Sequence, residues 1–278
     1  MSYQEPLSQI AVAISISDSN DMSVLGLAEE HLRDAMAEIA RYLLAMGARL
    51  VYGGDLRARG FTELLFELVA RHRRDSDEGD NRLAVMSYLP WPVHSAKAAE
   101  ELLSLASDLQ GVAEIHYLDP QGGELMPQAL QAEPVSAVKS EQWTSSLSSM
   151  RRVLTNASDA RIVLGGRVLG FKGRMPGIAE EVLCSLEAAQ PLFILGGFGG
   201  CARDIAEEIK LVAPRSFASD QWPGRDQFTS LDASVLRNGL NEDENATLAR
   251  TVHVDEAIAL ILRGLLHIAA EAAAVAKT

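Results

Sequence analysis

The amino-acid sequence predicts a three-layer α/β/α fold in which helices cover both faces of a mostly parallel sheet. Short runs rich in Val, Ile and Leu alternate along the chain with amphipathic segments of helical period. Glycine pairs directly follow several of these runs, as expected where parallel strands end at a ligand-binding edge. The pattern is that of one nucleotide-binding type of α/β domain over residues 9–213. Residues 214–278 are expected to form an irregular segment and C-terminal helices that pack on the same domain.

The first half of the chain predicts four strands and two helices. The first strand ends in a polar turn, and apolar residues of the first helix recur at every third or fourth position before Gly47 stops it. The predicted strands are Ile10–Ile16, Arg49–Tyr52, Leu83–Tyr88 and Glu114–Tyr117. The predicted helices are Glu29–Met46 and Thr62–Arg71.

The second half predicts two more strands, each preceded by a helix. Helix Trp143–Asn156 leads to strand Ala160–Leu164, and a helix with Pro176 and Gly177 at its entry leads to strand Leu192–Leu195. Proline and glycine mark Asp119–Ser140 as a long connection, either a lid over a site or a linker.

Composition restricts the classes of function. Of 278 residues, 47% are apolar, which is enough to build a core. The net charge of -13 disfavours binding to a nucleic-acid backbone, whereas a small anion still binds where cations gather. The first residues are polar, and Arg263, His267 and Glu271 interrupt the apolar tail Ala257–Ala276. We therefore expect a cytoplasmic protein without a membrane segment.

Cysteine and histidine spacing predicts neither a disulfide nor a metal site. Cys184 lies on the apolar face of a predicted helix, Cys201 follows a glycine run, and neither belongs to a CxxC pair. The six histidines have no ligand spacing. No cofactor is expected to be required.

The segment after strand Ala160–Leu164 carries the strongest functional signal. Glycines let backbone N–H groups approach a ligand closely, cationic side chains suit phosphate, and a helix start attracts anions. Carboxylates in the first turn of the next helix suit ribose hydroxyls or acid–base chemistry, although the helix dipole stabilises them there in any case. The candidate residues here are Gly166, Arg167, Lys172, Gly173, Arg174, Gly177, Glu180 and Glu181.

Further candidates follow other strands of the predicted sheet. The carboxyl ends of parallel strands meet at one edge, where ligands bind. These candidates are Ser15 and Ser17 after the first strand, Gly53, Gly54 and Asp55 after the second, and Gly197 and Gly199 after Leu192–Leu195. The sequence therefore predicts binding of a nucleotide or a nucleotide-derived small molecule.

Three motifs in this order resemble the SLOG superfamily, which joins the LOG (Lonely Guy, lysine-decarboxylase-like) proteins with DprA-type DNA-processing Rossmann domains. Val51–Gly54 resembles the family's VYGGG turn, and Met150–Arg152 resembles the segment with its catalytic arginine. Pro176–Glu181 lies where the family has PGGxGTxEE. The resemblance spans roughly residues 10–209 and implies a Rossmann-like three-layer fold.

The resemblance implies an activity and roles for individual residues. LOG enzymes cleave the N-glycosidic bond of a nucleoside 5'-monophosphate with an arginine and a glutamate. Those roles map onto Arg152, or Arg151 in the alternative register, and onto Glu181. Glu180 would hold ribose hydroxyls. Because LOG proteins commonly dimerise, the resemblance also implies a homodimer.

The phosphate loop departs from the LOG pattern. The compact PGGxGT becomes Gly165-Gly166-Arg167 followed by an insertion, and Ile178 stands at the threonine position. The longer, cationic loop favours a larger ligand, such as an ADP-ribose or NAD derivative. Related branches sense such molecules in bacterial antiphage defence and conflict systems. We therefore expect a nucleotide sensor or processing domain with an effector protein as partner. The two alternatives are a LOG-like hydrolase (a phosphoribohydrolase that cleaves the N-glycosidic bond of a nucleoside 5'-monophosphate) and an interaction subunit whose site has lapsed.

Overall fold

The structure is a computed structural model that describes residues 5–54, 56–57, 60–75, 83–111, 113–130, 135, 137–215 and 220–275. For 72–75 and 275 only the backbone is described. Asp55, one of the predicted ligand-binding residues, lies outside this set.

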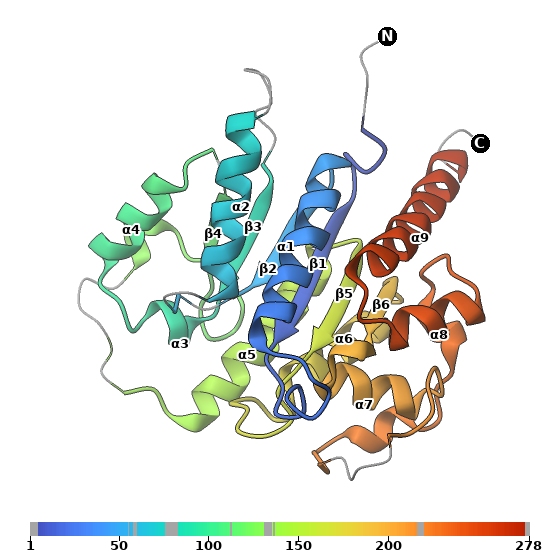
Figure 1. Ribbon diagram of the computed structural model, residues 1–278. Helices are drawn as coiled ribbons and strands as arrows, with labels where there is room; N and C mark the ends of the chain where they lie inside the picture. The colour runs from blue at the N-terminus through green and yellow to red at the C-terminus, as the bar shows by residue number, and fades with distance from the viewer. Residues whose placement is uncertain are drawn as a thin grey trace.

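The described strands form one parallel sheet in the order β4-β3-β2-β1-β5-β6. They are β1 Ala11–Ser17, β2 Arg49–Gly53, β3 Val85–Leu89, β4 Ala113–Tyr117, β5 Ala160–Gly165 and β6 Leu192–Leu195. The chain winds outward from β1 in one direction and then returns to place β5 on its other side (Figure 1). This reversal between β1 and β5 is the topological switch point, where open α/β sheets bind ligands.

Helices cover both faces of the sheet, which confirms the predicted three-layer fold. One core cluster joins one face to α1 Glu29–Ala45, α2 Phe61–Asp75, α8 Glu242–Arg250 and α9 Val254–Val275. The opposite face packs against α5 Ser140–Asn156, α6 Gly177–Glu187 and α7 Gly200–Glu208. Short 3₁₀ turns occur at Pro127–Ala129, Gly196–Phe198, Arg225–Phe228 and Ala233–Leu236.

Two helices were not predicted from the sequence, α3 Trp91–His94 and α4 Ala99–Asp108. Leu102, Leu105 and Leu109 give this segment a short apolar repeat of helical period, which was not recognised in the sequence, and Leu102 is the buried residue of α4. The helix contributes Leu102 to a small cluster with Leu89 and Tyr117 at the β4 edge of the sheet.

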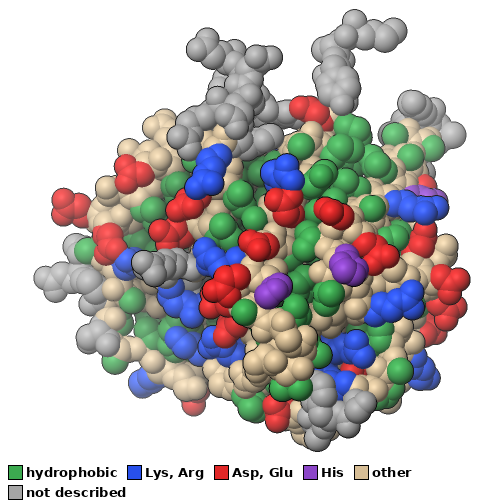
Figure 2. All heavy atoms as spheres, viewed as in Figure 1, with side chains coloured by type: hydrophobic (Ala, Val, Ile, Leu, Met, Phe, Trp, Pro, Cys, Tyr) green, Lys and Arg blue, Asp and Glu red, His purple; other side chains and the backbone are tan. Residues whose placement is uncertain are grey.

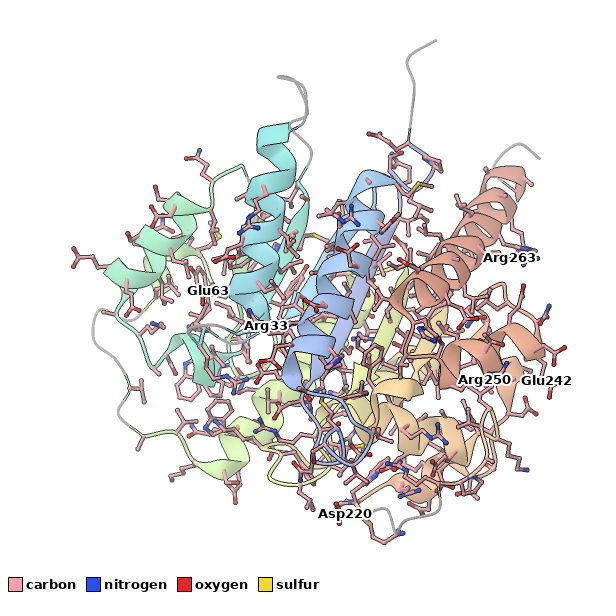
Figure 3. The ribbon with its side chains drawn as sticks, in the orientation of Figure 1. Arg33, Glu63, Asp220, Glu242, Arg250 and Arg263 are labelled. Carbon is pink, nitrogen blue, oxygen red and sulfur yellow. The ribbon has the colours of Figure 1, made fainter. Side chains whose placement is uncertain are left out.

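The C-terminal helices pack on the same domain. Ala257, Ile258, Ile261 and Leu265 of α9 belong to the core cluster that includes β1 and α1. Arg263 of α9 pairs with Glu244 of α8 at 2.7 Å, on the flank of the molecule where Arg250 also lies (Figure 3). Within the described residues, Val254–Ala274 is the one helix long and apolar enough to cross a membrane, with a mean hydropathy of 1.6. Of this span, 28% is buried inside the structure.

Charged side chains of both signs are interspersed over the face seen in Figure 2. Green apolar surface appears between them over the helices of that face. This mixed surface contrasts with the cavity described below, whose lining is biased towards cations.

Two substitutions in α9 test which of its faces is part of the core. Ile261 is 1% exposed, whereas Leu266 is 36% exposed. Replacing Ile261 by Ala should lower the free energy of unfolding by about 2–5 kcal/mol, because it leaves a cavity in the core. Leu266→Ala, the matched control, should cost roughly 1 kcal/mol or less. Chemical denaturation measures both, and equal effects would contradict this packing.

Candidate functional site

A cavity of about 670 Å³ opens at the carboxyl end of the sheet, next to the switch point. Its size is within the range of pockets that hold small-molecule ligands. The ends of β1 and β2, the chain around α3, one face of α5 and the loop before α6 form its walls. Nine of the predicted site residues line it: Ser15, Ser17, Gly53, Gly54, Arg151, Arg167, Lys172, Gly177 and Glu181.

Glu181 places a carboxylate at the cavity wall between two guanidinium groups. Its Oε1 lies 3.6 Å from Nε of Arg151, and its Oε2 lies 3.3 Å from Nη1 of Arg161. The Glu181 side chain is 13% exposed. Two adjacent cations compensate its negative charge at this depth. The carboxylate is therefore held in place while still facing the cavity.

Arg161 supports Glu181 from outside the cavity lining and was not singled out from the sequence; nor were Arg57, Lys97 and Trp143, which line the cavity. The Arg161 side chain is fully buried in β5, where Ser15, Ser185 and Thr155 accept hydrogen bonds at 2.8, 2.8 and 2.9 Å. Burial lowers the pKa of Arg161 and the carboxylate of Glu181 opposes that shift, but an arginine stays protonated. An arginine inside an otherwise apolar strand was the available signal.

Glu180 faces away from the cavity. It is 1% exposed and accepts hydrogen bonds from Ser148 and Arg151, and Nε of Arg174 lies 2.8 Å from its Oε1. Both Glu180 oxygens therefore have donors from within the protein. Arg174 pairs with this buried carboxylate, and neither residue belongs to the cavity lining. The contacts expected of Glu180 with ribose and of Arg174 with phosphate stay predictions, and the pairing of these two residues with each other does not favour them.

Gly173 and Gly177 make room for the Arg151 guanidinium. A Cβ atom on Gly173 would lie 3.0 Å from Nη1, and one on Gly177 would lie 2.8 Å from Nη2. The buried guanidinium thus passes between two glycines of the loop that the sequence identified as a phosphate loop. Arg151 is 6% exposed, and its Nε has no hydrogen-bond partner among the described residues.

The turn after β5 requires glycine and brings Arg167 to the cavity. Gly165 and Gly166 have φ of +64° and +110°, and a Cβ on Gly165 would lie 2.4 Å from the Ser17 carbonyl oxygen. The Arg167 amide donates to the Ser17 hydroxyl at 3.1 Å, and its Nη2 contacts both Asp18 oxygens at 2.8 and 2.9 Å. Arg167 is therefore already paired with Asp18 when a ligand reaches it.

Gly197 and Gly199 lie beside α7 and do not line the cavity. A Cβ on Gly197 would lie 2.1 Å from the carbonyl oxygen of Thr251. At the start of α7, the Gly200 amide donates to Oδ1 of Asp21 at 2.9 Å. Asp21 occupies the place that an anion would take at a helix N-terminus.

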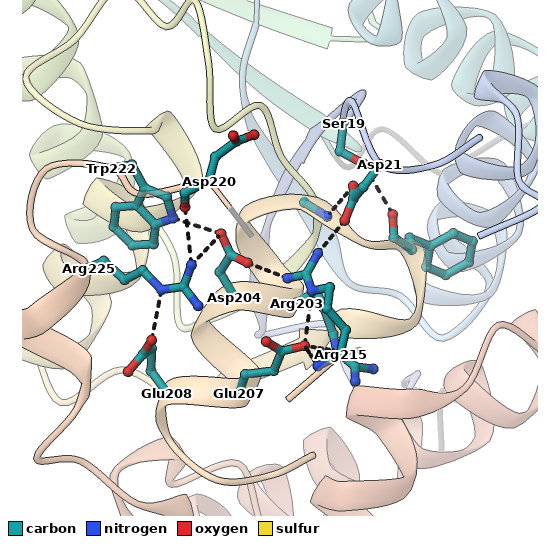
Figure 4. A network of polar contacts seen from close by, with 12 residues as sticks. Ser19, Asp21, Arg203, Asp204, Glu207, Glu208, Arg215, Asp220, Trp222 and Arg225 are labelled. Atoms are coloured by element: carbon teal, nitrogen blue, oxygen red, sulfur yellow. Dashed lines mark hydrogen bonds and ion pairs between the residues drawn. The ribbon is translucent and has the colours of Figure 1, made fainter. Parts of the chain in front are cut away.

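A network of ion pairs holds Asp21 at this position (Figure 4). Arg215 pairs with Asp21, Asp204 and Glu207. The Trp222 indole donates to Asp204 at 2.8 Å. The network fastens the chain after α7 to the loop after β1.

The structure also separates the two neighbouring arginines of α5. Arg151 is buried and lines the cavity, whereas Arg152 is exposed and is not part of the lining. Gly166 is buried beneath the cavity, where a Cβ would lie 2.8 Å from Ile178. Lys172 lies at the rim with its ammonium 3.8 Å from the centre of the Trp143 ring.

The described cavity lining carries more cationic than acidic side chains. The cations are Arg57, Lys97, Arg151, Arg167 and Lys172, and the acids are Asp18, Glu101 and Glu181. This bias occurs in a chain of net charge -13. A cleft with an excess of one sign of charge focuses its field and attracts ligands of the opposite sign.

Both cysteines are buried free thiols. Burial raises the pKa of Cys201 well above its ordinary value, and the Asp204 carboxylate adds to this, so Cys201 is held as a thiol. Among the side chains that the structure describes, no three His, Cys, Asp or Glu residues gather as metal ligands would.

Comparison with known proteins identifies a family and shows distant structural likeness to solved structures. The SLOG cluster2 family model matches residues 6–233. No curated protein matches the chain significantly. The X-ray structure of TM1055, a structural genomics target, is 18% identical, covers 71% of this chain and 81% of that chain, and has a TM-score of 0.37. That likeness is too distant to carry an argument about the site.

The role of Asp21 is open to a stability measurement. Asp21→Ala removes the acceptor of the Gly200 amide and one partner of the buried Arg215, so it should cost about 1–3 kcal/mol of folding free energy. The exposed Asp226 is a control, and Asp226→Ala should change stability by roughly 0.5 kcal/mol or less. Equal unfolding midpoints for the two variants would show that Asp21 does not hold this helix start.

Proposed function

The chain belongs to the SLOG cluster2 family, and on this premise we propose that its cavity binds a nucleotide or a nucleotide-derived molecule. The observation that carries the proposal is the excess of cations lining a cavity at the switch point of the sheet. Phosphate groups are the anionic part that such a lining attracts. Hydroxyl groups at Ser15 and Ser17 add neutral hydrogen-bonding capacity for a sugar.

Arg151 and Glu181 are the residues that we assign to direct ligand contact. Both line the cavity, and the Arg151 Nε makes no hydrogen bond among the described residues, although it lies 3.6 Å from Oε1 of Glu181. A guanidinium with an unused donor suits a phosphate or carboxylate oxygen. In the LOG-like register this favours Arg151 over its exposed neighbour Arg152.

The shape of the surface supports a ligand longer than a nucleoside monophosphate. A second hollow of about 980 Å³ lies between α2 and α4. Leu56, Arg57, Lys97 and Glu101 line both hollows, so the two are adjacent along a shared wall. An ADP-ribose or NAD derivative with one end in the cavity would extend along this wall.

We propose a sensing role, with cleavage as the second candidate. The loop that LOG chemistry uses is rebuilt here, with Gly173 and Gly177 spaced around a buried guanidinium. One observation favours cleavage: the Glu181 carboxylate faces the cavity, where it would stabilise an oxocarbenium-like ribosyl cation. The effector protein, the homodimer and a role in antiphage defence stay predictions from the family resemblance, and the cytoplasmic location stays a prediction from composition.

The test of binding is a thermal-shift screen against AMP, ADP-ribose, NAD and cyclic nucleotides, with isothermal titration of each hit. A ligand that binds only the folded protein raises its melting temperature by mass action. No shift with any nucleotide, together with no heat of binding, would refute the proposal.

The two neighbouring arginines of α5 provide a matched pair for the best ligand of that screen. Arg151→Lys keeps the charge and loses the planar guanidinium, so affinity should fall by about 10- to 100-fold. Arg152→Lys, at the exposed position, should leave affinity within about twofold. Titration calorimetry on variants of wild-type melting temperature gives both values. The reverse order would move the ligand contact to Arg152.

Product analysis distinguishes sensing from cleavage. For a sensor, wild type releases no free base from any nucleotide that it binds, and Glu181→Gln changes affinity alone. For a hydrolase, wild type releases base and a ribose phosphate over many turnovers, and Glu181→Gln abolishes release while most affinity remains. We expect the first result. Chromatography of the reaction mixtures measures it, and multiple turnovers by wild type would establish the second candidate.

A further inference from the structure

The aromatic ring of Trp143 lies at the cavity and takes no part in the contacts of Glu181 with Arg151 and Arg161. It lies one helical turn before Leu147 and two turns before Arg151 on α5, and all three line the cavity. Residues spaced by four and eight positions share one face of a helix. With a rise of about 1.5 Å per residue, the ring and the guanidinium are anchored about 12 Å apart along that face.

The Trp143 ring is covered by a cation and is not packed into the core. The Lys172 ammonium lies 3.8 Å from the ring centre, and the Trp143 side chain is half-buried. A cation seated there shows that the π face is reachable from the cavity side of the loop. The same face is what a nucleobase needs for stacking.

Lys172 differs from the other cations of the lining in its pairing. Arg167 pairs with Asp18, Lys97 pairs with Glu101, and Arg151 pairs with Glu180. Among the residues that the structure describes, Lys172 contacts no carboxylate within ion-pair distance; its ammonium rests on the ring instead. Its side chain is exposed, and its carbonyl oxygen accepts from the Thr144 hydroxyl at 3.4 Å. The backbone is thereby held near α5 while the ammonium has no strong partner.

We infer that Trp143 is the stacking platform for the base of the bound nucleotide. On binding, the base takes the place of the Lys172 ammonium on the ring, and the ammonium pairs with an anionic group of the same ligand. This assignment rests on the proposed function and specifies it further. One face of α5 then receives the base at Trp143 and the charged end of the ligand at Arg151.

The inference predicts a loss of affinity that depends on the base. AMP and ribose 5-phosphate share sugar and phosphate but differ in the base. Trp143→Ala should weaken AMP binding by about 5- to 150-fold, the range that stacking of one base supplies. Binding of ribose 5-phosphate, measured by titration and by competition against AMP, should stay within about twofold. Trp143→Phe retains a ring and should restore most of the AMP affinity.

A second measurement reports the contact directly. AMP should quench part of the intrinsic fluorescence of the wild type, and Trp143→Phe should remove that quenching. Trp222→Phe is the matched control because Trp222 is 5% exposed and donates to Asp204, outside the cavity lining. Quenching should persist in that variant.

The outcomes separate this inference from the proposed function. If Trp143→Ala leaves AMP affinity unchanged, or weakens AMP and ribose 5-phosphate equally, the ring only holds the loop and the inference is overturned while nucleotide binding stands. If wild type does not bind AMP, the inference fails. If no nucleotide in the screening panel binds, the proposed function fails with it.

Discussion

The buried guanidinium of Arg161 is the charge on which the arrangement of the cavity depends. A cation in the middle of a parallel sheet has no access to water, so the protein must surround it with acceptors. Those acceptors are Ser15 on β1, Thr155 on α5 and, on α6, Ser185 and the carboxylate of Glu181. One fully buried group thus ties two strands and two helices to one point. The orientation of Glu181 towards the cavity follows from that requirement.

Much of the fold was predictable because strands of a parallel sheet are buried on both faces and read as continuous apolar runs. Most strands were recognisable on that ground, and the long helices from their apolar period; the exception is the edge strand β4, which carries Glu114 and His116. For the site, the sequence predicted only its position, at the carboxyl ends of the strands. Sequence spacing assigned Gly173 and Gly177 to phosphate, whereas in the structure they flank the Arg151 guanidinium. That guanidinium arrives from α5, and a contact between distant segments leaves no local pattern.

The start of α7 shows a related limit. A glycine run between a strand and a helix has the same sequence appearance whether the helix N-terminus receives a ligand or a side chain of the protein itself. Here the carboxylate comes from Asp21, far from Gly200 in the chain. Arg215, which holds that carboxylate, comes from the segment after α7. Only the tertiary arrangement decides between an open anion site and an internal cap.

The loop after β1 has a mechanical consequence for any molecule that enters the cavity. Asp18 in this loop pairs with Arg167 at the cavity. Asp21, three residues after Asp18, pairs with Arg215. A phosphate that paired with Arg167 in place of Asp18 would break the ion pair that anchors residues 18–21 at the cavity. The ion pair of Asp21 with Arg215 holds the other end, so a ligand that took Arg167 would change the anchoring of this loop at one end only.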